Sequence, residues 1–264
     1  AIATDPGAAA GAALVIEASG GAPAVRRALL AVLAQAAPGA LPVSLGDLPG
    51  AGVALIDLPG DGVIEIRQGA DPRVCALVRR LGALPVVGAD FMGARLIAAL
   101  EDEAEALVFE GSTPWEVDAA AEAAGFALGP CAAQDRRGLD RAFARPRVLP
   151  LIARMVPEGR LGRKGGVGWY RYPGGGGRVI DPLIEDLARE EAYFAGVTPR
   201  AIAAPEIAAR LEAALWRCAR GLPGDPGVID LLSVLACAYP EARGGVLFAQ
   251  GGWTAGQSPG RVAP

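Results

Sequence analysis

The sequence predicts an α/β layer followed by an all-α half. Three observations predict this fold class. Short apolar runs alternate with stretches of helical spacing over the first 88 residues, as in a mostly parallel sheet with crossover helices. Beyond Gly88 the apolar residues recur only at helical spacing. With 264 residues, 52% of them hydrophobic, the chain can also bury a substantial core.

Each element of the first half follows from its local pattern. Apolar runs predict strands over residues 13–18, 41–44, 52–57 and 84–87, and the alternation in 62–67 is typical of a half-buried strand. Helical spacing predicts helices over 23–36 and 72–81, and Pro38-Gly39 ends the first.

The second half opens with a helix over 91–111, for which Gly111 is well placed as the C-terminal cap. Thr113, Pro114 and Glu116 then form the signature of a capped helix start, with the Glu three residues beyond the Thr. A Gly-rich turn at 173–177 separates two helical units, and a domain boundary falls near residue 89. Further helices are predicted over 138–143, 146–155, 182–194, 204–220 and 228–236.

Composition excludes several classes of function. The chain contains no His, so His-ligated metals and Ser-His-Asp or Cys-His catalysis cannot be built from its own residues, and no metal site is expected. A net charge of −4 argues against a general nucleic-acid binder. No apolar run is long enough to span a membrane, and four scattered Cys are typical of reduced thiols in a cytoplasmic protein. Abundant Ala, Gly, Pro and Arg, with a single Lys, is typical of a GC-rich bacterial genome.

Short motifs add little chemistry. Residues 256–260 match G-x-S-x-G but contain Pro259 and have no His as base. Residues 159–166 resemble a phosphate loop only in composition, and 174–177 suit a hairpin or linker. The 159–166 loop carries three basic residues, Arg160, Arg163 and Lys164, shortly before the aromatic pair Trp169-Tyr170. These basic residues either contact a phosphate or lie in a solvated turn that packs over the aromatic pair. The other three tryptophans are most simply packing anchors: Trp115, Trp216 and Trp253.

Taken together, several segments resemble 3-hydroxyacyl-CoA dehydrogenases in order and spacing. The most specific are EGSTPWEVD and GFALGP within residues 110–130 and GRKGGVGWYRY at 162–172. The resemblance continues through 228–248, which is similar to the second C-terminal repeat of multifunctional fatty-acid oxidation enzymes. It extends from about residue 3 to residue 253.

The resemblance implies a partial Rossmann-like parallel sheet over residues 1–89. It also implies a helical domain like the C-terminal domain of 6-phosphogluconate dehydrogenase, in two repeats, 90–172 and 173–264. The family's glycine fingerprint and ribose-binding acid have no counterpart in this chain, so no cofactor is expected, although the family uses NAD. Glu17 and Arg26 lie near the family's nicotinamide end, where they are either cofactor-binding residues or surface charges.

The family's acid–base centre implies four positions here. Its His falls on Ile56 or Asp57, its Glu on Glu65, its Ser near Asp47 and its Asn on Ala94, so only the Glu survives. General acid–base catalysis of this kind needs the imidazole, whose pKa lies near neutrality. Glu65 is therefore either a relict acid or an ordinary solvent-facing strand residue.

These observations predict a degenerate family member without dehydrogenase activity. It would act in fatty-acid metabolism as an acyl-CoA-binding remnant or as a partner or scaffold protein. The alternative is an NAD-dependent 3-hydroxyacyl-CoA dehydrogenase subunit completed by another chain. Because a parallel sheet is normally covered on both faces, we expect its exposed edge to meet a second copy or a fatty-acid-oxidation enzyme. An internal pseudo-dimer of the two repeats within a monomer is also consistent with the pattern.

Overall fold

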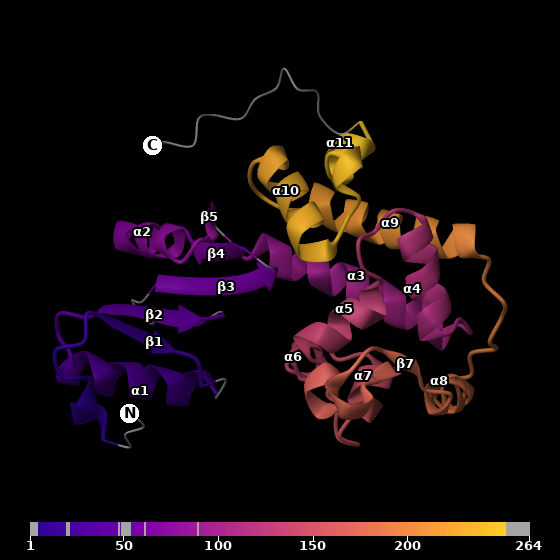
Figure 1. Ribbon diagram of the computed structural model, residues 1–264, viewed down its shortest axis with the longest axis horizontal. Helices are drawn as coiled ribbons and strands as arrows, with labels where there is room; N and C mark the ends of the chain where they lie inside the picture. The colour runs from indigo at the N-terminus through magenta and orange to yellow at the C-terminus, as the bar shows by residue number, and fades with distance from the viewer. Residues whose placement is uncertain are drawn as a thin grey trace. The chain divides into compact units, whose positions relative to one another are not determined.

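The computed structural model describes residues 5–19, 22–46, 48, 54–60, 62–88 and 90–251. The chain divides into two compact units, residues 1–94 and 95–264 (Figure 1). The predicted boundary at residue 89 lies outside the described residues and stays a prediction, as does the division into repeats at residue 173.

The first unit is built on a five-stranded sheet in the order β1-β2-β3-β4-β5. The strands are β1 (Leu14–Glu17), β2 (Leu41–Leu45), β3 (Ala54–Gly60), β4 (Val63–Arg67) and β5 (Leu84–Gly88), close to the predicted ranges. Three of the pairings are parallel, as expected for a mostly parallel sheet, and β3 with β4 is antiparallel. Only residues 61 and 62 join β3 to β4, and so short a connection can form only a hairpin.

Two helices cover opposite faces of this sheet. Val43 packs with α2 (Pro72–Arg80), whereas the next residue of β2, Ser44, contacts α1 (Pro23–Ala36), because successive strand residues point to opposite faces. A short 3₁₀ turn, η1 (Pro6–Ala9), precedes β1. Strand β4 was expected to be half-buried, but Val63, Ile64, Glu65 and Ile66 are all buried. Both faces of β4 are covered, because Ile64 and Ile66 pack with α2 and Glu65 on the opposite face contacts the amides of Met92 and Gly93, so that expectation was wrong.

The second unit is mainly helical, and α3 (Met92–Phe109) begins just before it. The next helices are α4 (Pro114–Ala123), α5 (Pro130–Arg137), α6 (Leu139–Phe143) and α7 (Pro150–Met155). They are followed by α8 (Leu183–Phe194), α9 (Ala204–Arg220), α10 (Pro226–Cys237) and α11 (Val246–Ala249). The 3₁₀ turns are η2 (Arg163–Gly165), η3 (Pro173–Gly175) and η4 (Glu241–Arg243). Fully buried side chains include Leu107, Leu139, Leu151, Met155, Trp169, Ile184, Leu211, Leu215 and Leu232.

The prediction of an all-α second half was wrong in one place. A short antiparallel hairpin pairs β6 (Tyr170–Arg171) with β7 (Val179–Ile180), and the Gly-rich run is its connection. Helix α5 was not predicted, because residues 130–135 are buried all round and show no amphipathic period. Helix α7 begins at Pro150 rather than at residue 146.

The caps read from the sequence are confirmed. Thr113 accepts a hydrogen bond from the Glu116 amide, and Glu116 accepts one from the Thr113 amide, which completes a capping box. After α3, Gly111 adopts φ +122°, and a Cβ there would lie 2.6 Å from the Arg200 carbonyl oxygen, so this turn requires glycine.

Within the described parts of the chain, no helix is both long enough and apolar enough to cross a membrane. Among the same residues, no three Cys, Asp or Glu side chains lie together as a metal site would require.

Candidate functional site

In open α/β sheets, ligands bind beyond the carboxyl ends of the parallel strands. In the first unit this edge carries a buried polar cluster formed by Glu17 at the end of β1, Ser44 near the end of β2 and Arg26 in the first turns of α1. Arg26 Nε donates to Glu17 Oε2 at 2.7 Å, and Ser44 Oγ donates to the same oxygen at 2.7 Å. A second Arg26 nitrogen donates to Ser44 Oγ at 2.7 Å and to the Leu45 carbonyl.

The Glu17 carboxylate is held in its ionised form. Burial alone would raise its pKa, but hydrogen bonds from Ser19, Ser44 and Arg26 outweigh burial and lower the pKa to about 2. The expectation that Glu17 and Arg26 are surface charges was therefore wrong, since both are buried and paired. Their role as cofactor-binding residues stays a prediction. Their polar atoms are directed at one another and tie β1, β2 and α1 together.

Glu65 lies on β4 with 2% of its surface exposed, so the solvent-facing alternative was wrong as well. Its Oε1 accepts a hydrogen bond from the Met92 amide at 2.8 Å, and its Oε2 accepts one from the Gly93 amide at 2.9 Å. Both amides belong to the first turn of α3, where N–H groups lack partners within the helix and the helix dipole favours a negative charge. Glu65 thus caps α3 from a neighbouring strand.

The structure brings some of the sequence-predicted positions together. Asp57 on β3 lies directly opposite Glu65 in the antiparallel register, and Ile56 pairs with Ile66. Ala94, at the position of the family's Asn, is half-buried and packs against the apolar cluster of Leu30, Leu48 and Phe91. Asp47 lies outside the described residues.

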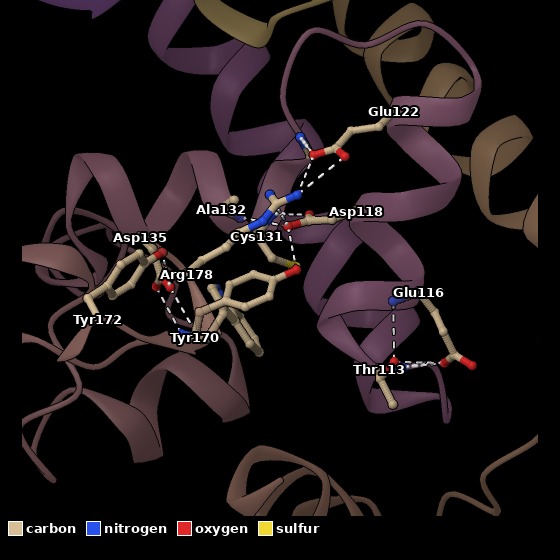
Figure 2. Close-up of polar contacts among 12 residues, drawn as sticks. Thr113, Glu116, Asp118, Glu122, Cys131, Ala132, Asp135, Tyr170, Tyr172 and Arg178 are labelled. Carbon is tan, nitrogen blue, oxygen red and sulfur yellow. Dashed lines mark hydrogen bonds and ion pairs between the residues drawn. The ribbon is translucent and has the colours of Figure 1, made fainter. Parts of the chain in front are cut away.

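The second unit contains a larger buried polar cluster, drawn in Figure 2. Asp118 of α4 accepts hydrogen bonds from the amides of Cys131 and Ala132, in the first turn of α5, at 2.8 and 3.0 Å. It also accepts one from the Tyr170 hydroxyl at 2.8 Å, and Arg178 lies 3.7 Å from its carboxylate. Burial raises the pKa of Asp118 to about 6 against the opposing effect of these donors.

Asp135, near the end of α5, joins the same cluster (Figure 2). Its carboxylate accepts hydrogen bonds from the amides of Trp169 and Tyr170 and from the Tyr172 hydroxyl, each at 2.9 Å. Burial raises its pKa to about 6. A Cβ on Gly168 would lie 1.9 Å from the Asp135 carboxylate, so the GWYRY segment reaches it only because glycine stands there. The two aspartates thus fasten α4, α5 and strand β6 together.

The basic residues of the 159–166 loop do not converge on a common site. Arg160 is buried, donates to the Gly168 carbonyl at 3.1 Å and pairs with Asp181 at 2.6 Å. Lys164 pairs with Asp140 at 2.6 Å, on the surface. The interpretation of these residues as a phosphate cluster therefore finds no support in their contacts.

A second buried aspartate caps a helix in the same way as Asp118. Asp230 of α10 accepts hydrogen bonds from the amides of Leu247 and Phe248 at 2.6 and 3.0 Å, as Asp118 does from α5. A Cβ on Gly245 would lie 2.2 Å from Asp230, just as one on Gly129 would lie 2.3 Å from Asp118. In both places Pro follows an N-cap residue and the aspartate comes four residues later, in Thr113-Pro114 and Asp225-Pro226. This likeness is what two related repeats would show.

Sequence reasoning missed the roles of these buried aspartates. A usable signal was present, because Asp118 and Asp230 both fall on the apolar face of a helix, where a charge needs a partner.

Comparison with known protein families identifies the class of protein to which the helical region is similar. Residues 91–172 match the family model described as "3-hydroxyacyl-CoA dehydrogenase, C-terminal domain". This region belongs to that family, and the resemblance read from the sequence is confirmed.

Individual proteins of known family show the same similarity. The chain is 30% identical over 205 residues to the peroxisomal bifunctional enzyme of Danio rerio, an alignment that covers 66% of this chain and 29% of that protein. It is 26% identical over 194 residues to the fatty acid oxidation complex subunit alpha of Shewanella loihica, covering 64% and 26%. The chain thus spans less than a third of the length of these relatives. The crystal structure of 3-hydroxybutyryl-CoA dehydrogenase from Escherichia coli shares the fold, with a TM-score of 0.62 at 21% identity over 90% of this chain and 74% of that one.

Proposed function

We propose that this chain keeps the fold of the 3-hydroxyacyl-CoA dehydrogenase family without its dehydrogenase chemistry. It acts in fatty-acid metabolism as a partner or scaffold protein, or as an acyl-CoA-binding remnant. The observation that carries the proposal is the position of Glu65. This is the one catalytic carboxylate that the resemblance retains, and both of its oxygens hold the first turn of α3. In a chain without His, no imidazole is present for it to orient.

The edge where a nucleotide would bind supports the same proposal. NAD in the family manner needs a strand, a Gly-rich turn and a helix N-terminus for the pyrophosphate. At the carboxyl ends of β1 and β2, the polar groups of Glu17, Arg26 and Ser44 are instead used in hydrogen bonds to one another. The described residues therefore do not fit NAD, and no step is assigned to it.

The helical unit supports a structural role. Its buried carboxylates are used as anchors: Glu105 holds the amides of Leu151 and Ile152 at the start of α7, as Asp118 holds α5. Such satisfied polar networks make a rigid body that can present a fixed surface to a partner or a ligand.

A second candidate is a dehydrogenase subunit completed by another chain. Two observations favour it. Asp57 is paired with Glu65 in the backbone register of β3 and β4. In addition, β1 lies at the edge of the described sheet, where Ile16 is 52% exposed, and on the opposite face of the sheet α1 exposes Val25, Leu29 and Val32. Such an edge and apolar face suit a second copy or a fatty-acid-oxidation enzyme as partner.

Calorimetric titration with acetoacetyl-CoA, with and without NADH, distinguishes an acyl-CoA-binding remnant from a partner or scaffold protein. Saturable heat with acetoacetyl-CoA that NADH does not change supports an acyl-CoA-binding remnant, and no heat with either supports a partner or scaffold role. Tight NADH binding by the isolated chain contradicts the proposal. For the second candidate, copurification with a partner and NADH-dependent turnover by the pair is the expected result, and Glu65→Gln should abolish that turnover.

A further inference from the structure

Helix α8 of the second unit exposes large apolar side chains on its outer side (Figure 1). Its inner side is formed by Ile184, Ala188 and Ala192, which are buried, and the helix packs against α7. On the outer side, Leu183 is 65% exposed and Phe194 is 71% exposed. A surface helix normally places polar or charged side chains there, and contiguous apolar residues on an exposed face mark a site of interaction.

The exposed apolar residues follow one line along the helix. Leu183, Leu187 and Phe194 are separated by four and seven residues, a spacing that places side chains on the same face of a helix. Tyr193 widens the line at its carboxyl end, where its ring meets the Phe194 ring edge to face with the centroids 5.8 Å apart. Two exposed residues of β7 come just before the amino end of the helix. Together these residues form the α8 surface: Val179, Ile180, Leu183, Leu187, Tyr193 and Phe194.

Excess negative charge borders the α8 surface. Among the described residues of α8 and the end of α7, five carboxylates form ion pairs with only two guanidinium groups, which leaves a net charge of −3. The carboxylates that pair with Arg154 are Glu158, Glu190 and Glu191, and those that pair with Arg189 are Glu185 and Asp186.

We propose that the α8 surface is the docking site for an amphipathic helix of another protein, one whose apolar face is flanked by Arg or Lys. The apolar line runs along a helix of 12 residues, about 18 Å, which is a length that a second helix can cover by packing along it. The negative border favours a basic partner over an acidic one. It also opposes two other occupants, a second copy of α8, which brings the same charge, and an anionic lipid surface.

This docking site is independent of the proposed function. It uses no residue of the first unit, where the sheet edge and Glu65 lie, and its occupation requires neither NADH nor acyl-CoA. A failure of the docking site and a failure of the proposed function are therefore seen in different assays.

Fluorescence anisotropy of a labelled synthetic helix tests the docking site. The probe has about 18 residues, with Leu on one face and Lys on the other, and a counterpart peptide carries Glu in place of Lys. We expect the full chain to bind the Lys peptide at least about tenfold more tightly than the Glu peptide, with a difference that shrinks as salt is raised. Equal affinity for the two peptides would overturn the proposal.

Substitutions locate the binding on the α8 surface. Replacing Leu183 and Phe194 together by Ser should weaken binding of the Lys peptide by about tenfold or more, because both ends of the apolar line are lost. The matched control is Leu81→Ser, which changes an apolar residue of similar exposure, 68%, in the first unit and should leave the affinity unchanged. Replacing Asp186 by Asn and Glu190 by Gln should weaken binding severalfold and reduce its salt dependence. If the chain with both Ser substitutions binds like the Leu81→Ser chain, the α8 surface is not the docking site.

Two further measurements distinguish other occupants. A dimer in sedimentation equilibrium that dissociates when Leu183 and Phe194 are replaced by Ser would contradict the proposal, because a second copy would then cover the surface. Binding to phosphatidylglycerol vesicles that is lost in the same variant would contradict it too, since the occupant would be a lipid surface. We expect a chain that stays monomeric and does not bind these vesicles, but does bind the Lys peptide.

Discussion

Replacing Glu65 by Gln tests the assignment of this residue as a helix cap. The carboxylate holds one amide with each oxygen, so Gln keeps one acceptor and turns its own NH₂ toward the other amide. One charge-assisted hydrogen bond contributes about 1.5–3 kcal/mol, and the negative charge at the start of α3 about 0.3–2 kcal/mol more. We expect Glu65→Gln to lower the free energy of unfolding of the first unit by about 2–4 kcal/mol.

Urea unfolding of the full chain, followed by far-UV circular dichroism, measures this loss. Amide exchange at Met92 and Gly93 locates it, because about 2 kcal/mol corresponds to roughly thirtyfold faster opening at those two sites. The matched control is Glu158→Gln, which removes a half-exposed carboxylate paired with Arg154 and should cost less than about 0.5 kcal/mol. If Glu65→Gln unfolds and exchanges like this control, the carboxylate does not cap α3 and the reasoning fails.

Three further outcomes follow from the buried groups. The pKa of Asp118 is raised above its unfolded value to about 6, so its contribution to stability is complete at low pH and is lost as pH rises through 6. In urea unfolding, the free energy of unfolding of the unsubstituted chain should therefore fall between pH 5 and pH 7.5 by about 1 kcal/mol more than that of Asp118→Asn. Gly245→Ala should destabilise by about 3–5 kcal/mol, since its φ is +112° and its Cβ would overlap a buried side chain, whereas Gly196→Ala, at φ +69° in open space, should lose only about 1–2 kcal/mol. Arg26→Met leaves the buried charge of Glu17 without its cationic partner. A loss of about 3–5 kcal/mol is expected in thermal unfolding, and a loss under 1 kcal/mol would be the contrary result.

Much of the fold could be predicted from the sequence because it depends on local patterns. The strands, the helix at 23–36, the capping box at Thr113 and the glycine cap at Gly111 each follow from neighbouring residues. Helix α5 could not be predicted in this way, because a helix buried on all sides has no periodic pattern.

The site was less accessible to sequence reasoning. Glu65 meets its amides 27 and 28 residues away, and Asp118 meets Tyr170 at a separation of 52. Periodicity treats a charged residue as solvent-facing, whereas these carboxylates are buried because distant backbone amides satisfy them. Only the three-dimensional arrangement shows such partners. The same limit applied to Glu17 and Arg26, whose spacing gives no sign that they pair.

The most direct test of the central claim is an NADH oxidation assay with acetoacetyl-CoA, using a His-containing dehydrogenase as positive control. We expect no turnover that increases with the concentration of this chain, because Glu65 is a helix cap and the chain contains no imidazole. Turnover by the isolated chain that scales with its concentration and disappears in Glu65→Gln would contradict the account.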